Sequence, residues 1–381
     1  MRAGELAETL AVLDRLIAFN TVSANSNLAL AEYVETYLRD RGFAVHRMPD
    51  PTGQKAGLYA RIGPASGGIL LSAHTDVVSA EGQGWSRDPF RLTREEGRLY
   101  GRGTTDMKGF LAAMLALADR ASKADLKEPL KLSVSYDEEV GCLGIARMIG
   151  ALPDVLGMPR AAIVGEPTEM TVAIGHKGKV GLKAIAHGEA GHSSLAPKFE
   201  NALYVAADFM GRLRGLQGWY AEHGAHDSGY DIGHATIHVG KMAGGTALNI
   251  VPDRAEMQFE VRYLAGDDLD AILGRINELA GEGIDLEQTV AYPGLQTSST
   301  ARVTKLACSL AATNATTKVA FGTEAGFFDS SGIPTVVCGP GSMEGQGHKP
   351  DEFVTVDQMV ACHAMMNRIL MTLTRGDGSI A

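Results

Sequence analysis

Residues 68–76 have the sequence GILLSAHTD, in which an apolar strand pattern ends directly in a histidine and a carboxylate. Two further apolar runs, at Lys131–Tyr136 and Ala161–Val164, are also followed by carboxylates. A strongly apolar helix pattern from Met107 to about Ala121 lies between the first two runs. Short buried strands that alternate with helices are typical of α/β domains. The sequence therefore predicts an α/β fold with a mixed, mostly parallel sheet flanked by helices.

The pattern changes from about Gly178 and returns to strand and helix signals from about Tyr292. Apolar residues alternate with polar or small ones from Val180 to Ala186, which predicts a half-buried strand. A helix, two strands, a helix and a strand are then expected at residues 201–216, 235–239, 255–263, 267–280 and 286–290. This β-α-β-β-α-β order is ferredoxin-like. We therefore expect residues 179–292 to form a small domain inserted into a larger one made of residues 1–178 and 293–381.

The composition argues against nucleic acid and membranes as binding partners. The chain has 381 residues and a formal net charge of −10, which argues against binding to nucleic acid or to an anionic membrane surface. The longest apolar stretch, Phe110–Ala118, is far shorter than the ~20 residues needed to cross a bilayer. Near the start, Leu6, Leu10 and Leu13 predict an amphipathic helix and not a signal peptide, so a cytoplasmic location is expected.

The cysteines limit the kind of metal site. Cys142, Cys308, Cys338 and Cys362 are widely spaced, and none belongs to a Cys-x-x-Cys pair. This spacing supports neither a thiolate zinc site nor a disulfide framework. All four are expected as small buried or half-buried side chains. Any metal ion bound by this chain must therefore be held by histidine and carboxylate side chains.

Histidines and carboxylates recur at the ends of the predicted strands. His74 follows the first strand, and Asp76 is well placed to orient its imidazole. Glu166 follows the third strand, and His348 follows a glycine-rich run at Cys338–Gly347. Ligands bind beyond the carboxyl ends of strands in α/β sheets, so these side chains are candidates for one shared site.

Two acidic motifs have two interpretations each. Asp137-Glu138-Glu139 follows a predicted strand, and three adjacent carboxylates repel one another unless a cation lies among them. A solvated acidic turn is the simpler interpretation of that run taken alone. Asp106, within Gly101–Gly109, can cap the apolar helix that follows it, or it can bridge metal ions at the electropositive helix start. Local sequence does not separate these roles, and both can hold for Asp106.

Jointly, these motifs predict a metal site with nitrogen and oxygen ligands. Chance does not readily place two histidines and a set of carboxylates at the same edge of one sheet. Neutral imidazole with carboxylate suits Zn²⁺ first, and Co²⁺ or Mn²⁺ next. Two histidines and three carboxylates are enough to bind two ions that share one bridging ligand. Such a pair of ions can stabilise both the attacking and the leaving atom of a displacement reaction.

Six motifs, taken together and in this order, resemble the M20 metallopeptidase family, and the match runs from about residue 70 to about residue 355. Each motif is weak alone, but the set is highly specific. The motifs are His74-Thr75-Asp76, Gly101–Gly109, Asp137-Glu138-Glu139, Gly165-Glu166-Pro167-Thr168, Gly191-His192-Ser193-Ser194 and Gly347–Glu352.

The resemblance implies a ligand set for two divalent ions. Asp106 would bridge both ions. His74 and Glu166 would complete the coordination of one ion, and Glu139 and His348 that of the other. Zn²⁺ is the expected metal and Co²⁺ the alternative. The resemblance also implies that the peptide bond after Asp106 is cis.

The resemblance further implies a base and a dimer. Glu138 would be the general base of amide hydrolysis. His192 of the partner subunit would reach the tetrahedral oxyanion, which makes residues 179–292 a lid and dimerisation domain and the enzyme a homodimer. The local sequence at His192, with Gly188 and Gly191 beside it, is explained more simply by a histidine in a surface turn.

Four further residues suit an amino-acid substrate. Arg262 can hold a carboxylate in a bidentate pair, and Asn249 can donate to a carbonyl. Gly322 and Thr323 lie in a predicted strand-to-helix turn whose backbone donors can face the same end of the substrate. Without the family, an edge-strand arginine and a turn asparagine explain Arg262 and Asn249 equally well.

Within the family, three stretches look most like the acetylornithine deacetylases: Phe259–Asp268, Gly322–Gly326, and Cys338–Gly341 leading to His348–Glu352. This implies removal of the Nα-acetyl group of acetylornithine, a step of arginine biosynthesis. The alternative is an M20 amidase of other N-acyl amino acids, of the succinyl-diaminopimelate desuccinylase, aminoacylase or glutamate carboxypeptidase type. A catalytically silent metal- or amino-acid-binding protein is the non-enzymatic alternative.

Other hydrolase and nucleotide-binding classes lack their motifs. A serine nucleophile elbow needs glycine where Leu195 stands. A single-zinc protease needs His-Glu-x-x-His, and no histidine in this chain precedes a glutamate. The glycine-rich stretches also lack the spacing of phosphate-binding and dinucleotide-binding loops.

Overall fold

The computed structural model describes residues 3–376, which divide into two compact units, each with its own hydrophobic core. The larger unit, called the catalytic unit below because it contains the predicted metal ligands, comprises residues 3–175, 295–319 and 323–376. The smaller unit, called the lid unit below after the role expected for the inserted segment, comprises residues 176–294 and 320–322. The α/β architecture with an inserted small sandwich confirms the fold class predicted from the sequence.

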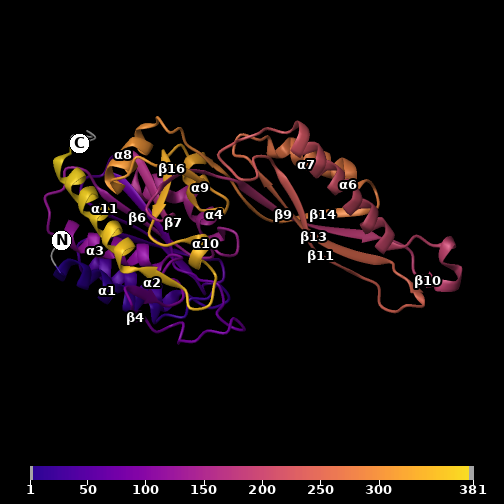
Figure 1. The fold of residues 1–381 in the computed structure, drawn as a ribbon, viewed down its shortest axis with the longest axis horizontal. Helices are drawn as coiled ribbons and strands as arrows, with labels where there is room; N and C mark the ends of the chain where they lie inside the picture. The colour runs from indigo at the N-terminus through magenta and orange to yellow at the C-terminus, as the bar shows by residue number, and fades with distance from the viewer. Residues whose placement is uncertain (1–2, 377–381) are drawn as a thin grey trace. The chain divides into compact units, whose positions relative to one another are not determined.

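The catalytic unit is built on a nine-stranded mixed sheet flanked by helices (Figure 1). Along the sheet, neighbouring strands follow the order β1 (Ala44–Pro49), β2 (Ala56–Ile62), β6 (Leu130–Ser135), β3 (Ile69–His74), β7 (Ala161–Pro167), β17 (Thr335–Gly339), β8 (Val172–His176) and β15 (Leu295–Gln296), and β16 (Thr316–Val319) pairs with β8.

The centre of this sheet is parallel, and its carboxyl edge carries the predicted site. β3 pairs in parallel with β6 and β7, and β7 pairs in parallel with β17, whereas β1, β2 and β6 pair antiparallel. β3 and β6 are buried along their whole length, as expected for strands covered on both faces. The register places His74 beside Ser135, so the residues after these two strands meet at one edge.

One helix of this unit, α3 (Lys108–Ala121), is buried on nearly all sides. It packs against β3, β6 and β7 and also against α1 and α11, which explains why its sequence is apolar all round. No helix of the described chain is long and apolar enough to cross a membrane. The other helices of the unit are α1 (Ala3–Ile17), α2 (Leu28–Arg39), α4 (Leu143–Met148), a 3₁₀ turn (Ile149–Ala151), α5 (Leu152–Leu156), α8 (Arg302–Ala311), α9 (Ala325–Ser330), α10 (Met343–Gln346) and α11 (Val356–Arg375).

A small three-stranded sheet joins two distant parts of the catalytic unit. Its order is β18 (Phe353–Thr355), β5 (Arg98–Tyr100) and β4 (Thr93–Glu95), all antiparallel. The pairing of β18 with β5 brings the segment after His348 against the loop that leads to Asp106.

The lid unit has the predicted βαββαβ order, with a four-stranded antiparallel sheet and two helices on one face of it (Figure 1). The sheet order is β11-β13-β9-β14. A separate two-stranded ribbon pairs β10 with β12, and a 3₁₀ segment (Ser193–Lys198) follows β10. In chain order the elements are β9 (Gly178–His187), β10 (Gly191–His192), α6 (Ala202–His223), β11 (Thr236–Gly244), β12 (Ile250–Val251), β13 (Arg254–Tyr263), α7 (Leu269–Ala280) and β14 (Ile284–Tyr292).

Candidate metal centre

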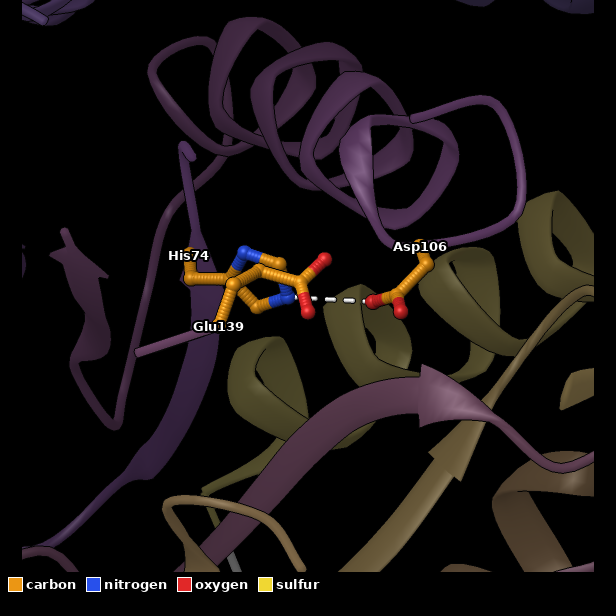
Figure 2. Close-up of side chains that lie close together, drawn as sticks. All are labelled: His74, Asp106 and Glu139. Atoms are coloured by element: carbon orange, nitrogen blue, oxygen red, sulfur yellow. Dashed lines mark hydrogen bonds and ion pairs between the residues drawn. The ribbon is translucent and has the colours of Figure 1, made fainter. Parts of the chain in front are cut away.

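His74 is the last residue of β3, and its imidazole is buried (Figure 2). The Nδ1 atom lies 3.0 Å from the backbone oxygen of Asp76, to which it donates. This contact turns Nε2 toward two carboxylates, with Oδ1 of Asp106 at 3.1 Å and Oε1 of Glu166 at 3.6 Å. Burial opposes the charged imidazole, but Asp106 and Asp76 raise the pKa of His74 well above its usual value. The surroundings of Nε2 therefore favour positive charge.

Asp106 lies between the two histidines. Its Oδ1 atom faces His74, and its Oδ2 atom lies 3.3 Å from Nε2 of His348. Burial raises the pKa of Asp106, but hydrogen bonds from His348 and His74 outweigh it and hold that pKa below its usual range. The N-cap of α3 is Met107 and carries no side-chain cap, so the capping interpretation of Asp106 is wrong. The Asp106–Met107 peptide bond is cis, as the family resemblance implies.

Asp76 connects the histidine strand to the acidic turn. Its carboxylate accepts the backbone N–H of Glu138 at 3.1 Å and that of Glu139 at 3.2 Å. The Ser23 hydroxyl donates to it at 2.7 Å, and Nδ1 of His74 lies 3.5 Å from it. Asp76 thus holds the turn after β6 in a fixed position relative to the end of β3.

The acidic turn is not a solvated surface feature. The side chain of Glu139 is only 6% exposed, and Asp137 is buried and paired with Lys55. Burial raises the pKa of Glu138 well above its usual value, with Glu139 and Asp106 adding to the effect and His74 opposing it. Burial and the Asp106 charge also raise the pKa of Glu139 to about 7. The simpler interpretation of this run is therefore wrong.

His348 completes the cluster, although it lies far from the other cluster residues in sequence. Its Nε2 atom lies 2.9 Å from Oε2 of Glu139 and 3.3 Å from Oδ2 of Asp106. Hydrogen bonds to Asp106 and Glu139 raise the pKa of His348 to about 10. His348 has a positive φ of 61°, and its side chain is 48% exposed, so it forms the solvent-facing side of the cluster.

The donor set fits divalent cations. His74, Asp106 and Glu139 present ligand atoms within 4.8 Å of one another, and so do His74, Glu138 and Glu166. The Oε1 atoms of Glu139 and Glu166 are buried without a hydrogen-bond partner. A buried carboxylate oxygen without a partner is costly unless a cation compensates it. Imidazole nitrogen and carboxylate oxygen are the ligands that suit Zn²⁺, Co²⁺ or Mn²⁺.

Two predicted residues of the lid unit lie side by side. His192 pairs with Ile250 across the β10–β12 ribbon, and the backbone N–H of Ser193 donates to the carbonyl of Asn249 at 3.1 Å. His192 is exposed, and its Nδ1 atom contacts Ser194. The lid fold thus brings His192 and Asn249, which are far apart in sequence, into one exposed ribbon.

Arg262 lies on β13 and is held by its neighbours in the lid unit. Its Nε atom donates to Oε1 of Glu260 at 2.8 Å. Burial lowers the pKa of Arg262, but Tyr292 and Glu260 raise it above its usual value overall. Gly322 also meets Tyr292, because a Cβ atom at Gly322 would lie 2.2 Å from the tyrosine ring. Arg262 and Gly322 are therefore both neighbours of Tyr292.

Thr323 belongs to the catalytic unit and is buried, and its hydroxyl accepts the backbone N–H of Ala325 at 3.0 Å. The next residue, Glu324, is buried as well and accepts a hydrogen bond from Ser72 of β3 at 3.1 Å. Burial raises the pKa of Glu324 to about 7. Thr323 thus lies just before α9, in a turn that the hydrogen bond between Glu324 and Ser72 connects to the central strand β3.

Sequence reasoning missed several residues that support the cluster. Cys142 donates from Sγ to Oε1 of Glu138 at 3.3 Å, and Glu352 accepts the backbone N–H of Asp106 at 3.1 Å. Glu352 was visible as part of the motif after His348, but its partner is far away in sequence. Nothing in the local sequence distinguishes Cys142 from an ordinary buried thiol.

Comparison with known proteins agrees with this geometry. Residues 70–372 match the family described as peptidase family M20/M25/M40. An acetylornithine deacetylase of Klebsiella pneumoniae (strain 342) is 33% identical over 354 residues, which cover 89% of this chain and 91% of that protein. An acetylornithine deacetylase of Pasteurella multocida (strain Pm70) is 32% identical over 370 residues, which cover 93% of this chain and 95% of that protein.

Solved structures share the fold. An M20 family metallo-carboxypeptidase from Sulfolobus solfataricus has a TM-score of 0.80 at 20% identity, over 96% of this chain and 99% of that one. A dinuclear metal binding peptidase of the M20 family from Bacillus subtilis has a TM-score of 0.69 at 15% identity, over 98% of this chain and 99% of that one. The sequence match and the buried cluster of histidines and carboxylates agree, and this chain belongs to peptidase family M20/M25/M40 as one of its hydrolases.

Proposed function

We propose that this M20 hydrolase is a dimetal amidohydrolase that removes the Nα-acetyl group of acetylornithine and releases ornithine and acetate. One observation carries the reaction class: side chains from five separate segments converge in one buried, cation-favouring cluster. They are His74, Asp106, Glu138, Glu139, Glu166 and His348. The names of the curated relatives described above support acetylornithine as the substrate.

The proposed ligand assignment is the one that the family resemblance implies, and distances in the cluster support it. Asp106 has one oxygen toward each histidine, which suits a bridging carboxylate. His74 and Glu166 would hold one ion. Glu139 and His348, which are 2.9 Å apart, would hold the other. Zn²⁺ is the expected ion and Co²⁺ the alternative.

Glu138 is proposed as the general base. Two bound metal ions would supply Lewis acidity at the scissile carbonyl and would lower the pKa of a water molecule. Glu138 would take a proton from the water as the water oxygen bonds to the carbonyl carbon, and would give that proton to the amine nitrogen as the C–N bond breaks. Burial raises the pKa of Glu138 above its usual value, and a raised pKa favours a carboxylate that accepts a proton. The thiol of Cys142 holds Oε1 of Glu138, which leaves Oε2 to carry the proton.

Residues of the lid unit, and Thr323 of the catalytic unit, are proposed to bind the amino-acid part of the substrate. Arg262 would pair with the α-carboxylate, and Asn249 would donate to a carbonyl oxygen. Gly322 and Thr323 would present backbone donors to the same end. His192 of the partner subunit would stabilise the oxyanion, which requires a homodimer formed through the lid unit. The adjacency of His192 and Asn249 in one exposed ribbon supports a shared role for the two.

The test is hydrolysis of a panel of Nα-acyl amino acids by chelated and by Zn²⁺- or Co²⁺-reloaded protein. The panel contains acetylornithine, succinyl-diaminopimelate and several acetyl amino acids. We expect activity that is lost on chelation, restored by metal, and highest on acetylornithine. Metal-restored activity that prefers another acyl amino acid would retain the mechanism and replace the substrate. Substrate binding without hydrolysis of any member would contradict the amidohydrolase proposal and favour a silent binding protein.

A further inference from the structure

Glu352 is a fully buried carboxylate that faces the loop carrying Asp106. Its Oε1 atom accepts the backbone N–H of Thr105 at 2.8 Å, and those of Gly103 and Asp106 at 3.1 Å each. Its backbone oxygen accepts the N–H of Gly101 at 2.9 Å. One acidic residue thus fixes the backbone of the loop up to and including Asp106.

Arg102 pairs with this carboxylate and extends the contact toward His348. Its Nη1 atom lies 2.7 Å from Oε2 of Glu352, and both side chains are 1% exposed. Its Nη2 atom donates to the side-chain oxygen of Gln83. The amide nitrogen of Gln83 donates in turn to the backbone oxygen of His348 at 3.3 Å. A chain of contacts therefore runs from the backbone of Asp106 to the backbone of His348.

We infer that Glu352 and Arg102 are positioning residues that hold Asp106 and His348 at the separation needed to share a metal ion. The inference rests on the proposed dimetal function. The inference follows from what the two side chains contact. The Glu352 carboxylate accepts the backbone N–H of Asp106 itself, and the Arg102 guanidinium is connected through Gln83 to the backbone carbonyl of His348. His348 has a positive φ and lies in a turn outside any helix or strand, so the contact from Gln83 helps to fix its backbone.

A matched control lies at the other edge of the same sheet. Arg160 and Glu128 form a partly buried ion pair at 2.6 Å. They lie just before β7 and β6, at the amino ends of the strands, whereas the metal ligands lie at the carboxyl ends. Removing the Glu128 carboxylate therefore breaks an ion pair, though a more exposed one, without touching the loop at Asp106.

The experiment compares Glu352→Gln, Gln83→Leu and Glu128→Gln with the unaltered protein. Each metal-free protein is titrated with Zn²⁺ to obtain stoichiometry and Kd, its Co²⁺ absorption spectrum is recorded, and its melting temperature is measured. We expect Glu352→Gln to weaken metal binding about 10- to 100-fold and to change the Co²⁺ spectrum, since outer contacts of metal ligands have effects of this size. Gln83→Leu should weaken it less, and Glu128→Gln should lower only the melting temperature.

The outcomes separate this inference from the proposed function. Two Zn²⁺ ions bound by Glu352→Gln with unchanged Kd and Co²⁺ spectrum would overturn the positioning role alone. Equal losses of affinity in Glu352→Gln and Glu128→Gln would also overturn it, because general destabilisation would then explain both. Failure of the unaltered protein to bind two ions would overturn the dimetal proposal itself. If Glu352→Gln does not fold, unchanged Zn²⁺ affinity in Gln83→Leu decides against the inference.

Discussion

The Oδ1 atom of Asp76 accepts the backbone N–H of Glu138 at 3.1 Å. The proposed base is thus held through its main chain, by a carboxylate that also faces the His74 imidazole at 3.5 Å. Any change at Asp76 is therefore transmitted both to the first histidine of the cluster and to the acidic turn.

We expect Asp76→Asn to lower both metal affinity and turnover, by about 10- to 100-fold. Asparagine has only one side-chain acceptor oxygen. Its NH₂ group would therefore face one backbone N–H, of Glu138 or Glu139, which in the unaltered protein donates to a carboxylate oxygen of Asp76. Zn²⁺ titration and steady-state kinetics measure the two effects. Ser23→Ala, which removes only one hydrogen bond to Asp76, is the control and should stay close to the unaltered protein. Equal effects of the two substitutions would contradict this role of Asp76.

Glu138→Gln should keep both metal ions and lose nearly all turnover. The amide cannot accept the proton, and general base catalysis contributes about 10²- to 10⁴-fold. Metal analysis of the purified variant, followed by assay after reloading, measures both properties. Asp137→Asn is the control from the same run, because Asp137 faces Lys55 and not the cluster, and it should retain most turnover. Full activity of metal-loaded Glu138→Gln would rule out the proposed base.

Metal binding should strengthen as the pH rises. In the metal-free protein the pKa of His348 is raised to about 10 and that of Glu139 to about 7, so both carry protons on the acidic side of these values. A ligand must lose its proton to bind metal, so protons compete with Zn²⁺ and the apparent affinity falls as the pH is lowered. Calorimetric titration in buffers with different ionisation enthalpies counts the released protons. We expect more protons released at about pH 6 than at about pH 8. Equal affinity and no proton release at both values would refute the proposed roles of His348 and Glu139.

A mixing experiment tests whether His192 acts across a dimer. His192→Ala and Glu138→Gln should each be nearly inactive alone. In a mixed dimer, the subunit with intact Glu138 would receive His192 of the partner subunit, so one complete site forms. Random exchange should restore about one quarter of the unaltered activity, because about half of the dimers are mixed and each has one working site of two. The assay follows activity after co-refolding. No recovery on mixing, or a fully active monomer, would contradict the cross-subunit role.

Much of the fold and most of the cluster could be predicted from the sequence, because both are encoded locally. The apolar runs that became β3, β6 and β7 end in His74, Asp137-Glu138-Glu139 and Glu166, and parallel strands bring their carboxyl ends to one edge. Alternating polarity likewise predicted the βαββαβ order of the lid unit. Periodicity reports which side of an element is buried, and this was sufficient to place these three motifs at one edge of the sheet.

Contacts between distant segments hold these residues in place, and local sequence does not predict those contacts. The contact between Asp106 and Glu352 spans 246 positions, and that between Ser72 and Glu324 spans 252. Neither leaves a local pattern, because a carboxylate that accepts backbone N–H groups looks the same in sequence as one that faces solvent. Only the folded structure shows, in the same way, that Met107 and not Asp106 is the N-cap of α3, and that the Asp106 carboxylate lies between His74 and His348. Local polarity patterns thus predict which groups lie at the edge of the sheet, whereas packing between distant segments determines where each of them points.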